Sequence, residues 1–409
     1  MALQPLPTLK SRSFSSYIAT QFLGAFNDNI FKQMLLLLAV AAWSSSDGPA
    51  KDYQGVVTAI FTIPFLLFSG YAGQLSEIYP KTTIMRLSKI GELFIMIGGA
   101  VGFYYNNTTL LLVFLFFMGS QSAFFGPAKY GVIPEMVKSD RLVAANGVVQ
   151  MTTILSIILG VALGGILTKN LKGQLHMAGF FCIVIAIIGV VVVHIIPKSK
   201  ANKPEMTFNW NPIGRLWLSF KDIFADRPLL LALVAYSYFF FSGAIVMKAV
   251  NNYGMMVLGL DEQETSFMLV FMSFGIIFGS LCAAPAQRTF GGKWTIFTGA
   301  LGVCIFEFLM IFHHLPMGVL KFFLFMAGSF SALYFVPIAA FMQDRPALGK
   351  KGEILAAVNF SNFSGIMLSA VVWQGLMSMG YSAVAAWLLL SIGLAILLAI
   401  MFPQLKKIE

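Results

Sequence analysis

The feature that most constrains this chain is a series of long apolar runs, each bounded by polar residues, glycine or proline. Twelve of them reach the roughly 20 residues that an α-helix needs to cross the hydrocarbon core of a bilayer. They lie at residues 14–43, 53–75, 82–104, 109–131, 142–167, 175–196, 229–257, 264–286, 294–313, 318–342, 354–380 and 381–402. Runs of this length fit helices rather than barrel strands. The sequence therefore predicts an all-α integral membrane protein with twelve transmembrane helices.

The composition excludes several function classes. Of the 409 residues 58% are hydrophobic and 11% charged, against about 25% charged in a soluble domain. The net charge of +10 is spread over short loops, so we expect no nucleic-acid partner. The cysteines, Cys182, Cys282 and Cys304, lie inside apolar runs without CxxC spacing, which indicates small buried side chains. Because no nucleophile–base or metal-ligand group stands out, we expect neither an enzyme nor a metal or other cofactor.

The basic residues predict the orientation of the chain in the membrane. If both termini are cytoplasmic, 21 of the 27 Lys and Arg residues fall on inner loops, tails and adjoining helix ends, Lys89 among them, and four fall outside. Cytoplasmic loops of membrane proteins carry an excess of Lys and Arg. We therefore predict cytoplasmic termini.

A repeat divides the chain into halves. Gly119-Ser-Gln-Ser-Ala123 recurs as Gly328-Ser-Phe-Ser-Ala332, 209 positions later and in the same order. This predicts two parallel six-helix repeats, residues 1–196 and 229–409, with a substrate site near the midplane between them. The linker, 197–228, has apolar residues at helical spacing, which predicts an amphipathic helix on the inner leaflet; a plain linker is the alternative.

The first apolar run contains the strongest signal for a functional site. Its middle, Gln21–Gln33, places an acid, a base and several amides among residues suited to hydrocarbon. A charge at membrane depth costs roughly 3 kcal/mol or more, so it is expected to face an interior or a wet cavity. Asp28 and Lys32 are four residues apart and share one helix face. We predict that Asp28, Asn29 and Lys32 bind substrate; a purely structural pair on the helix face is the alternative.

Two further lysines fall at membrane depth. At about 1.5 Å per residue, Lys129 lies near the inner interface, Asp28 near mid-depth and Lys248 in the outer third. We predict that all three face a common cavity between the halves. Alternatively, Lys129 could snorkel to inner phosphates and Lys248 could form a structural ion pair between helices. Glu92 and Glu307 also lie at apolar depth, with packing and proton handling both open.

These features resemble the major facilitator superfamily. The inner motif of that superfamily is matched in part by Gly73-x-Leu75-Ser76-Glu77 followed by Lys81, with Glu in place of the usual Asp and the second glycine missing. The resemblance implies the major facilitator fold. It also implies gating roles for Glu77, for Lys81 and for Arg288, which follows the apolar run at 264–286.

Three longer motifs are similar to those of the bacterial lysophospholipid transporters: Gln21-Phe22-Leu23-x-Ala25-Phe26-x-Asp28-Asn29, Pro127-Ala128-Lys129-Tyr130-Gly131 and Ala145-Asn146-Gly147. The resemblance places Lys129 and Tyr130 among the substrate-binding residues. It also implies that Lys248 stands where the family has an arginine. A lysine keeps the positive charge but cannot form the two parallel hydrogen bonds that an arginine makes with a phosphate.

The function implied by this resemblance is a lysophospholipid transporter, or flippase. It would move lysophospholipids such as lysophosphatidylethanolamine from the outer to the inner leaflet of the bacterial inner membrane for reacylation. Because no acyltransferase sequence follows Glu409, we expect a separate acyltransferase and acyl-carrier-protein synthetase as partner. The alternative is a proton-coupled carrier of a small polar solute or drug, with Asp28 or Glu92 titrating. No carboxylate or histidine relay runs from span to span, which favours transport without an ion gradient.

Overall fold

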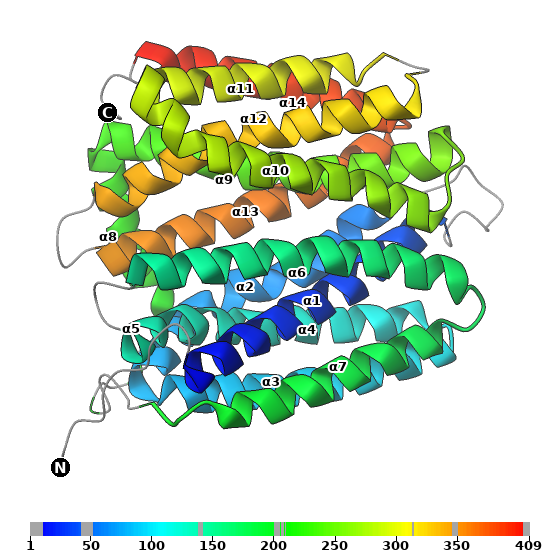
Figure 1. Ribbon diagram of the computed structural model, residues 1–409, viewed down its shortest axis with the longest axis vertical. Coiled ribbons are helices and arrows are strands. Elements are labelled where there is room, and N and C mark those ends of the chain that lie inside the picture. Colours follow the sequence, from blue (N-terminus) through cyan, green and yellow to red (C-terminus); the bar gives the residue numbers. More distant parts are fainter. Residues whose placement is uncertain are drawn as a thin grey trace. The chain divides into compact units, whose positions relative to one another are not determined.

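The protein, seen in a computed structural model, is almost entirely helical (Figure 1). The structure describes residues 11–41, 52–137, 142–199, 205, 208, 210–312, 315–345 and 351–403. Within these residues, twelve helices have 18 or more residues, and each coincides with one of the predicted apolar runs. The predicted positions of the twelve long helices are therefore confirmed.

The first six runs form six long helices. A four-residue helix, α5, which was not predicted, lies between the fourth run and the fifth. The side chain of Asn107 caps α4 by accepting a hydrogen bond of 3.0 Å from the backbone N–H of Leu110. The helices are α1 (Arg12–Ala41), α2 (Gln54–Ile78), α3 (Lys81–Tyr104), α4 (Thr108–Gly131), α5 (Ile133–Met136), α6 (Leu142–Asn170) and α7 (Leu175–Ile195).

The last six runs form α9 (Arg227–Asn252), α10 (Glu262–Phe290), α11 (Gly292–Leu309), α12 (Met317–Asp344), α13 (Lys351–Ser378) and α14 (Ala383–Met401). A π-helical turn, Tyr253–Val257, extends α9. Asp261 and Glu264 form a capping box at the start of α10. The predicted boundary between the last two runs is confirmed, because Gly380 has a φ of 79°, a conformation that glycine adopts without strain.

Nine of the helices described are long and apolar enough to cross a membrane by length and composition: α2, α4, α6, α7, α9, α10, α11, α12 and α14. The other three long helices carry more polar residues. In α1 and α3 these include the charges Asp28, Lys32, Lys89 and Glu92. Lys89 and Glu92 are buried, so the polar residues of α3 that lower its hydropathy face the interior of the protein rather than lipid.

The chain divides into two compact units. Unit 1 comprises Met1–Leu35 and Ile60–Pro212, and unit 2 comprises Leu36–Ala59 and Ile213–Glu409. Helices α1 and α2 therefore contribute residues to both units. The division into domains at residues 196 and 229 stays a prediction, as does the two-fold axis relating the halves.

The sequence repeat has a counterpart in how glycines pack. Gly119 of α4 approaches α2 so closely that a Cβ would lie 2.3 Å from the carbonyl oxygen of Phe61. In unit 2, a Cβ on Gly328 of α12 would lie 2.1 Å from the carbonyl oxygen of Met272 in α10. Small residues let helix backbones approach closely within a membrane. The glycines that the repeat equates thus make the same kind of contact, one in each unit.

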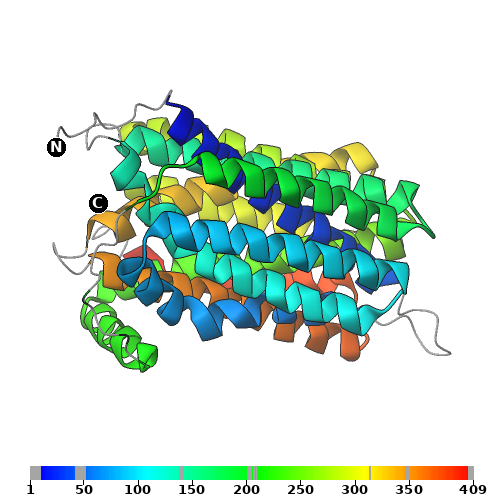
Figure 2. The same cartoon turned by 90° about the horizontal axis from the view of Figure 1, so that it is seen from below.

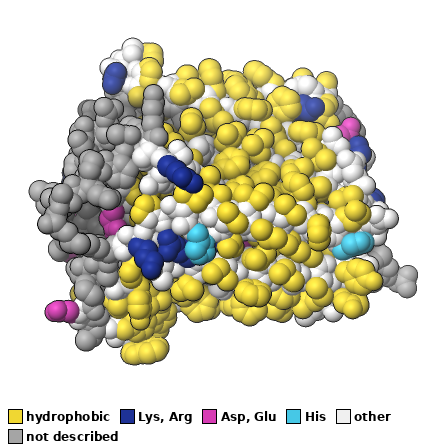
Figure 3. Space-filling view, turned by 60° about the horizontal axis from the view of Figure 1, so that its bottom comes forward, with side chains coloured by type: hydrophobic (Ala, Val, Ile, Leu, Met, Phe, Trp, Pro, Cys, Tyr) yellow, Lys and Arg dark blue, Asp and Glu magenta, His cyan; other side chains and the backbone are white. Residues whose placement is uncertain are grey.

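The outer faces of α3 and α7 are apolar. The two helices lie side by side in unit 1 (Figures 1 and 2), and their outward residues Leu87, Phe94, Phe180 and Val191 are exposed. Hydrophobic side chains cover most of the middle of the face shown in Figure 3, with Lys and Arg toward its ends. A surface of this kind is suited to lipid hydrocarbon.

The linker contains the predicted amphipathic helix, α8 (Pro212–Ala225), which begins with proline at its first position. Its buried side includes Ser219 and Ile223, whereas Trp217 and Phe224 are exposed. Figure 1 shows α8 running across the ends of the long helices of unit 2 rather than alongside them. Its place on the inner leaflet stays a prediction.

Candidate substrate-binding site

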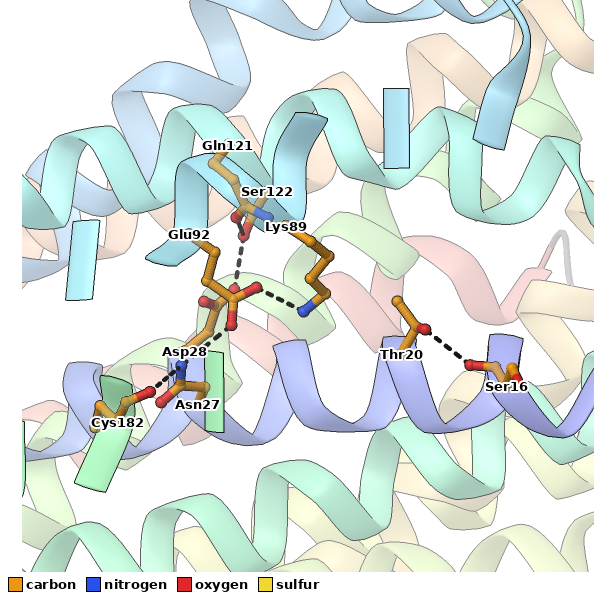
Figure 4. A network of polar contacts seen from close by, with 9 residues as sticks. All are labelled: Ser16, Thr20, Asn27, Asp28, Lys89, Glu92, Gln121, Ser122 and Cys182. Atoms are coloured by element: carbon orange, nitrogen blue, oxygen red, sulfur yellow. Dashed lines mark hydrogen bonds and ion pairs between the residues drawn. The ribbon is translucent and has the colours of Figure 1, made fainter. Parts of the chain in front are cut away.

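Asp28 lies at the centre of a group of polar side chains in unit 1. The hydroxyl of Ser122 in α4 donates a hydrogen bond of 2.6 Å to Oδ2 of Asp28 (Figure 4). The other oxygen, Oδ1, is buried and accepts no hydrogen bond from the residues that the structure describes. This acceptor of the carboxylate is therefore unsatisfied within the described part of the chain.

Two lysines of unit 1 present their ammonium groups to aromatic rings. Nζ of Lys32 lies 5.3 Å from the ring centre of Phe61, and Nζ of Lys129 lies 4.7 Å from the ring centre of Tyr130. Asp28 attracts both lysines electrostatically. Both side chains are only partly buried.

Asp28 and Lys32, which the sequence places on one helix face, form no direct salt bridge. Ion pairs among the fully described side chains join Lys81 to Glu135, Lys89 to Glu92 and Arg345 to Asp226. Lys32 and Lys129 are thus cations held by cation–π contacts, which are weaker than a buried salt bridge and easily replaced by an anionic ligand.

The sequence reasoning missed Lys89, which it counted with the inner helix ends. Lys89 and Glu92 are both 1% exposed, and Nζ of Lys89 lies 2.5 Å from Oε2 of Glu92. The side-chain amide of Asn27 in α1 donates hydrogen bonds of 3.1 Å both to Oε1 of Glu92 and to the carbonyl of Cys182 in α7. The i, i+3 spacing of Lys89 and Glu92 on one helix face is the signal that could have found the pair.

Asn29 and Tyr130, also predicted to bind substrate, are placed differently. The side chain of Asn29 donates a hydrogen bond of 2.7 Å to the carbonyl of Ala25 in its own helix. Gly160 of α6 lies so close that a Cβ on it would be 2.8 Å from Cβ of Asn29. Tyr130 is 46% exposed. The amide of Asn29 is therefore already used within α1, while Tyr130 supplies the ring beneath Lys129.

Lys248 belongs to unit 2 and is buried there. Its Nζ donates a hydrogen bond of 3.1 Å to the hydroxyl of Ser369 in α13. Its backbone carbonyl accepts a hydrogen bond of 3.0 Å from the side-chain amide of Gln54 at the start of α2. The predicted cavity shared by Lys248, Asp28 and Lys129 stays a prediction.

A polar network that the sequence reasoning did not identify surrounds this part of unit 2. The carboxylate of Asp52 accepts hydrogen bonds from the backbone N–H and the side-chain amide of Gln54, at 2.8 and 2.9 Å, and from the side-chain amide of Asn252 at 2.8 Å. Asn251 donates to Oε1 of Gln54 at 2.8 Å. Burial raises the pKa of Asp52, while these hydrogen bonds act in the opposite direction. The network ties the segment that precedes α2 to the end of α9.

The residues with predicted gating roles are distributed over both units. Lys81 at the start of α3 is buried and pairs with Glu135 of α5. The side chain of Glu77 lies outside the described residues. Arg288 is exposed in the last turn of α10. Their gating roles stay predictions. Among the described side chains, no group of three or more His, Cys, Asp or Glu is arranged to hold a metal ion.

The comparison with protein families decides the family. Residues 17–370 match the family model of the Major Facilitator Superfamily. The chain belongs to this superfamily. Its all-α membrane fold is that of major facilitator transporters, as the sequence predicted.

Relatives of this major facilitator protein include curated transporters. It is 27% identical over 379 residues to the lysophospholipid transporter LplT of Escherichia fergusonii, covering 90% of this chain and 89% of that protein. It is 26% identical over 417 residues to the lysophospholipid transporter LplT of Photorhabdus laumondii, covering 98% of this chain and 96% of that protein.

Solved structures share the fold at low identity. A POT family transporter in complex with 5-aminolevulinic acid matches with a TM-score of 0.75 at 11% identity, covering 97% of this chain and 96% of that chain. A point mutant of the nucleoside transporter NupG matches with a TM-score of 0.72 at 12% identity, covering 95% of this chain and 99% of that chain. At such identities these likenesses show the fold alone.

Proposed function

We propose that this protein is a lysophospholipid transporter of the bacterial inner membrane. It moves lysophospholipids such as lysophosphatidylethanolamine from the outer to the inner leaflet, with both of its own termini cytoplasmic. The proposal is supported by relatives named lysophospholipid transporter that align over about nine-tenths of their own length or more. It is also supported by the polar group around Asp28, whose chemistry suits a phospholipid headgroup.

The observation that carries the proposal is that unit 1 offers charged groups of both signs that form no salt bridge with each other. Lys32 and Lys129 rest against aromatic faces, so each ammonium can turn to a phosphodiester oxygen. Oδ1 of Asp28 accepts no hydrogen bond, so it can receive an ethanolamine ammonium. A zwitterionic headgroup would satisfy both at once.

The balance of charges also favours a phosphate. The group around Asp28 comprises three bases, Lys32, Lys89 and Lys129, and two acids, Asp28 and Glu92. One base is in excess, and a charge at membrane depth is costly unless it is compensated. A phosphodiester supplies one negative charge to the excess base. The ammonium of lysophosphatidylethanolamine brings a positive charge of its own, so this argument favours the phosphate and leaves the ammonium to Asp28. Lys248 of unit 2 would add a further base on the route of the phosphate.

Coupling to an ion gradient is not required by this function. If reacylation consumes the lysophospholipid at the inner leaflet, removal of the product drives net movement. A separate acyltransferase and acyl-carrier-protein synthetase would be the partner that does so. The acyl tail would stay against apolar surface, which the lipid-facing helices supply.

The test uses purified protein in phospholipid vesicles with radiolabelled lysophosphatidylethanolamine in the outer leaflet. Albumin extracts whatever remains in that leaflet, so the label that resists extraction measures flipping. We expect protein-dependent loss of extractable label, equal with and without an imposed proton gradient, and none in protein-free vesicles. Vesicles with protein that behave like protein-free vesicles would rule the proposal out. Flipping that needs the gradient and is abolished when a protonophore dissipates it would favour the proton-coupled alternative.

A further inference from the structure

We propose that Lys89 and Glu92 are positioning residues, which act through Asn27 to set the rotation of α1 and thereby aim Asp28 at the substrate. This inference rests on the proposed function of the Asp28 site. It assigns to a buried ion pair of α3 a role in substrate affinity, although neither residue need touch the substrate.

The pair is connected to α1 by hydrogen bonds and by shape. The side-chain amide of Asn27 has two N–H groups, and they reach Glu92 in α3 and the carbonyl of Cys182 in α7. One turn earlier in α1, Gly24 leaves the space that Nζ of Lys89 occupies, since a Cβ there would lie 2.4 Å from that atom. The side of α1 that bears Gly24 and Asn27 is therefore fixed against α3 and α7.

Fixing that side determines where Asp28 points. Successive residues of an α-helix are about 100° apart around its axis. With Asn27 held toward Glu92 and Cys182, Asp28 is turned toward α4, where Ser122 binds one of its oxygens (Figure 4). A rotation of α1 by even part of that angle would break this hydrogen bond and move the open oxygen Oδ1.

An ion pair is not needed here for stability alone. Replacing a buried pair with apolar side chains of similar volume is often neutral or stabilising, whereas removing one partner is strongly destabilising. What an apolar pair cannot do is accept the hydrogen bond of Asn27. Lys89 in turn holds Glu92 in place and faces the ring of Phe125 at 5.6 Å. The polar pair thus gives α1 a defined rotation that apolar packing does not specify.

The test compares three variants in the vesicle assay. The first, Lys89→Met with Glu92→Met, removes both charges and keeps approximate volume. The second, Asn27→Leu, removes the link from α1. The control, Thr20→Val, removes a hydrogen bond of α1 to its own carbonyl at Ser16, with no partner on another helix. We expect both test variants to raise the apparent KM for lysophosphatidylethanolamine roughly tenfold or more when assayed at a temperature at which each is shown to be folded, and the control to leave KM unchanged.

A second readout is independent of transport. Asp28→Cys is made in a background carrying Cys182→Ala, Cys282→Ala and Cys304→Ala. The rate at which a water-soluble methanethiosulfonate labels the new cysteine is measured with and without the double substitution Lys89→Met and Glu92→Met, called the Met pair. We expect labelling to change at least about fivefold when the pair is replaced. Unchanged labelling together with a wild-type KM in the Met pair would overturn the positioning role. Changed labelling in a protein that flips no lysophospholipid would leave positioning intact and reject the proposed substrate instead.

Discussion

Nζ of Lys81 at the start of α3 lies 2.6 Å from Oε1 of Glu135 in α5, so this lysine pairs within its own unit. Lys81 is 2% exposed and Glu135 29%. Gly131, just before α5, makes room for the lysine, because a Cβ on it would lie 2.7 Å from Cε of Lys81. The sequence singled out Lys81 as a gating residue, and the structure adds Glu135 as its partner.

We therefore expect Glu135→Gln to destabilise the protein by about 1–3 kcal/mol, because it leaves a buried ammonium without its counter-charge. Lys81→Met should cost less, since the partly exposed Glu135 can be solvated. Thermal unfolding in detergent measures both. Equal losses of stability in the two variants would show that the burial of Lys81 is not the main reason why breaking this pair destabilises the protein.

At the substrate site, we expect Asp28→Asn to slow flipping of lysophosphatidylethanolamine by about tenfold or more. The substitution keeps the size of the side chain and its contact with Ser122 but removes the charge that receives the ammonium. Lysophosphatidylglycerol, which has no ammonium, should be affected less. Expression and unfolding temperature serve as controls. Wild-type flipping of both lipids by Asp28→Asn would show that this charge does not contact the headgroup.

For Lys248, we expect Lys248→Ala to impair flipping and Lys248→Arg to keep it within about twofold of wild type, since arginine retains the charge and adds donors suited to phosphate. Lys248→Met is the matched control for burial: it fills the space of the lysine without the charge. Flipping rates are to be compared at equal protein density in vesicles. A Met variant as active as wild type would mean that Lys248 serves only the packing around Ser369.

The glycines of the repeat provide a test of the packing in both units. Gly119→Ala and Gly328→Ala place a Cβ against a backbone oxygen that cannot swing away, so each should destabilise by about 1–3 kcal/mol. In contrast, Gly91→Ala and Gly318→Ala meet no atom within 4 Å and should be neutral or slightly stabilising, because alanine favours helix. Unfolding temperatures in detergent are the measurement. A tolerated alanine at either repeat position would contradict the close approach there.

The Asp226–Arg345 pair gives a pH-dependent contribution to stability. Nε of Arg345 donates to Oδ2 of Asp226 at 2.8 Å, and this hydrogen bond lowers the pKa of Asp226 below its ordinary value. A carboxylate with a lowered pKa stabilises the fold at pH values above its unfolded pKa, and that contribution is lost as pH falls through the folded pKa, below about pH 4. Because both groups are partly exposed, we expect no more than about 1 kcal/mol.

The variant Asp226→Asn should therefore unfold at a slightly lower temperature than wild type at pH 7 and at the same temperature near pH 3. Glu205→Gln, which removes the same charge at an exposed residue, controls for net charge. If the difference in unfolding temperature between Asp226→Asn and wild type stayed the same at acidic pH, the stabilisation could not come from the charge of Asp226.

The amino-acid sequence alone determined the positions and helical nature of the twelve long segments, because crossing a bilayer without water requires long apolar helices. It also predicted α8 from the spacing of its apolar residues, and it identified Asp28 as a charge at membrane depth. These are local properties: each depends on residues that are neighbours in the chain or lie within a few turns of one helix.

Only the tertiary structure decided which polar groups meet. Asn27 and Glu92 are 65 positions apart, and Lys81 and Glu135 are 54 apart, so neither pairing follows from spacing along one helix. The sequence placed Asp28 with Lys32 because they share a helix face, whereas the structure binds Asp28 to Ser122 of another helix. A buried polar group takes the partner that packing brings within hydrogen-bond distance, and that partner is set by which helices lie side by side.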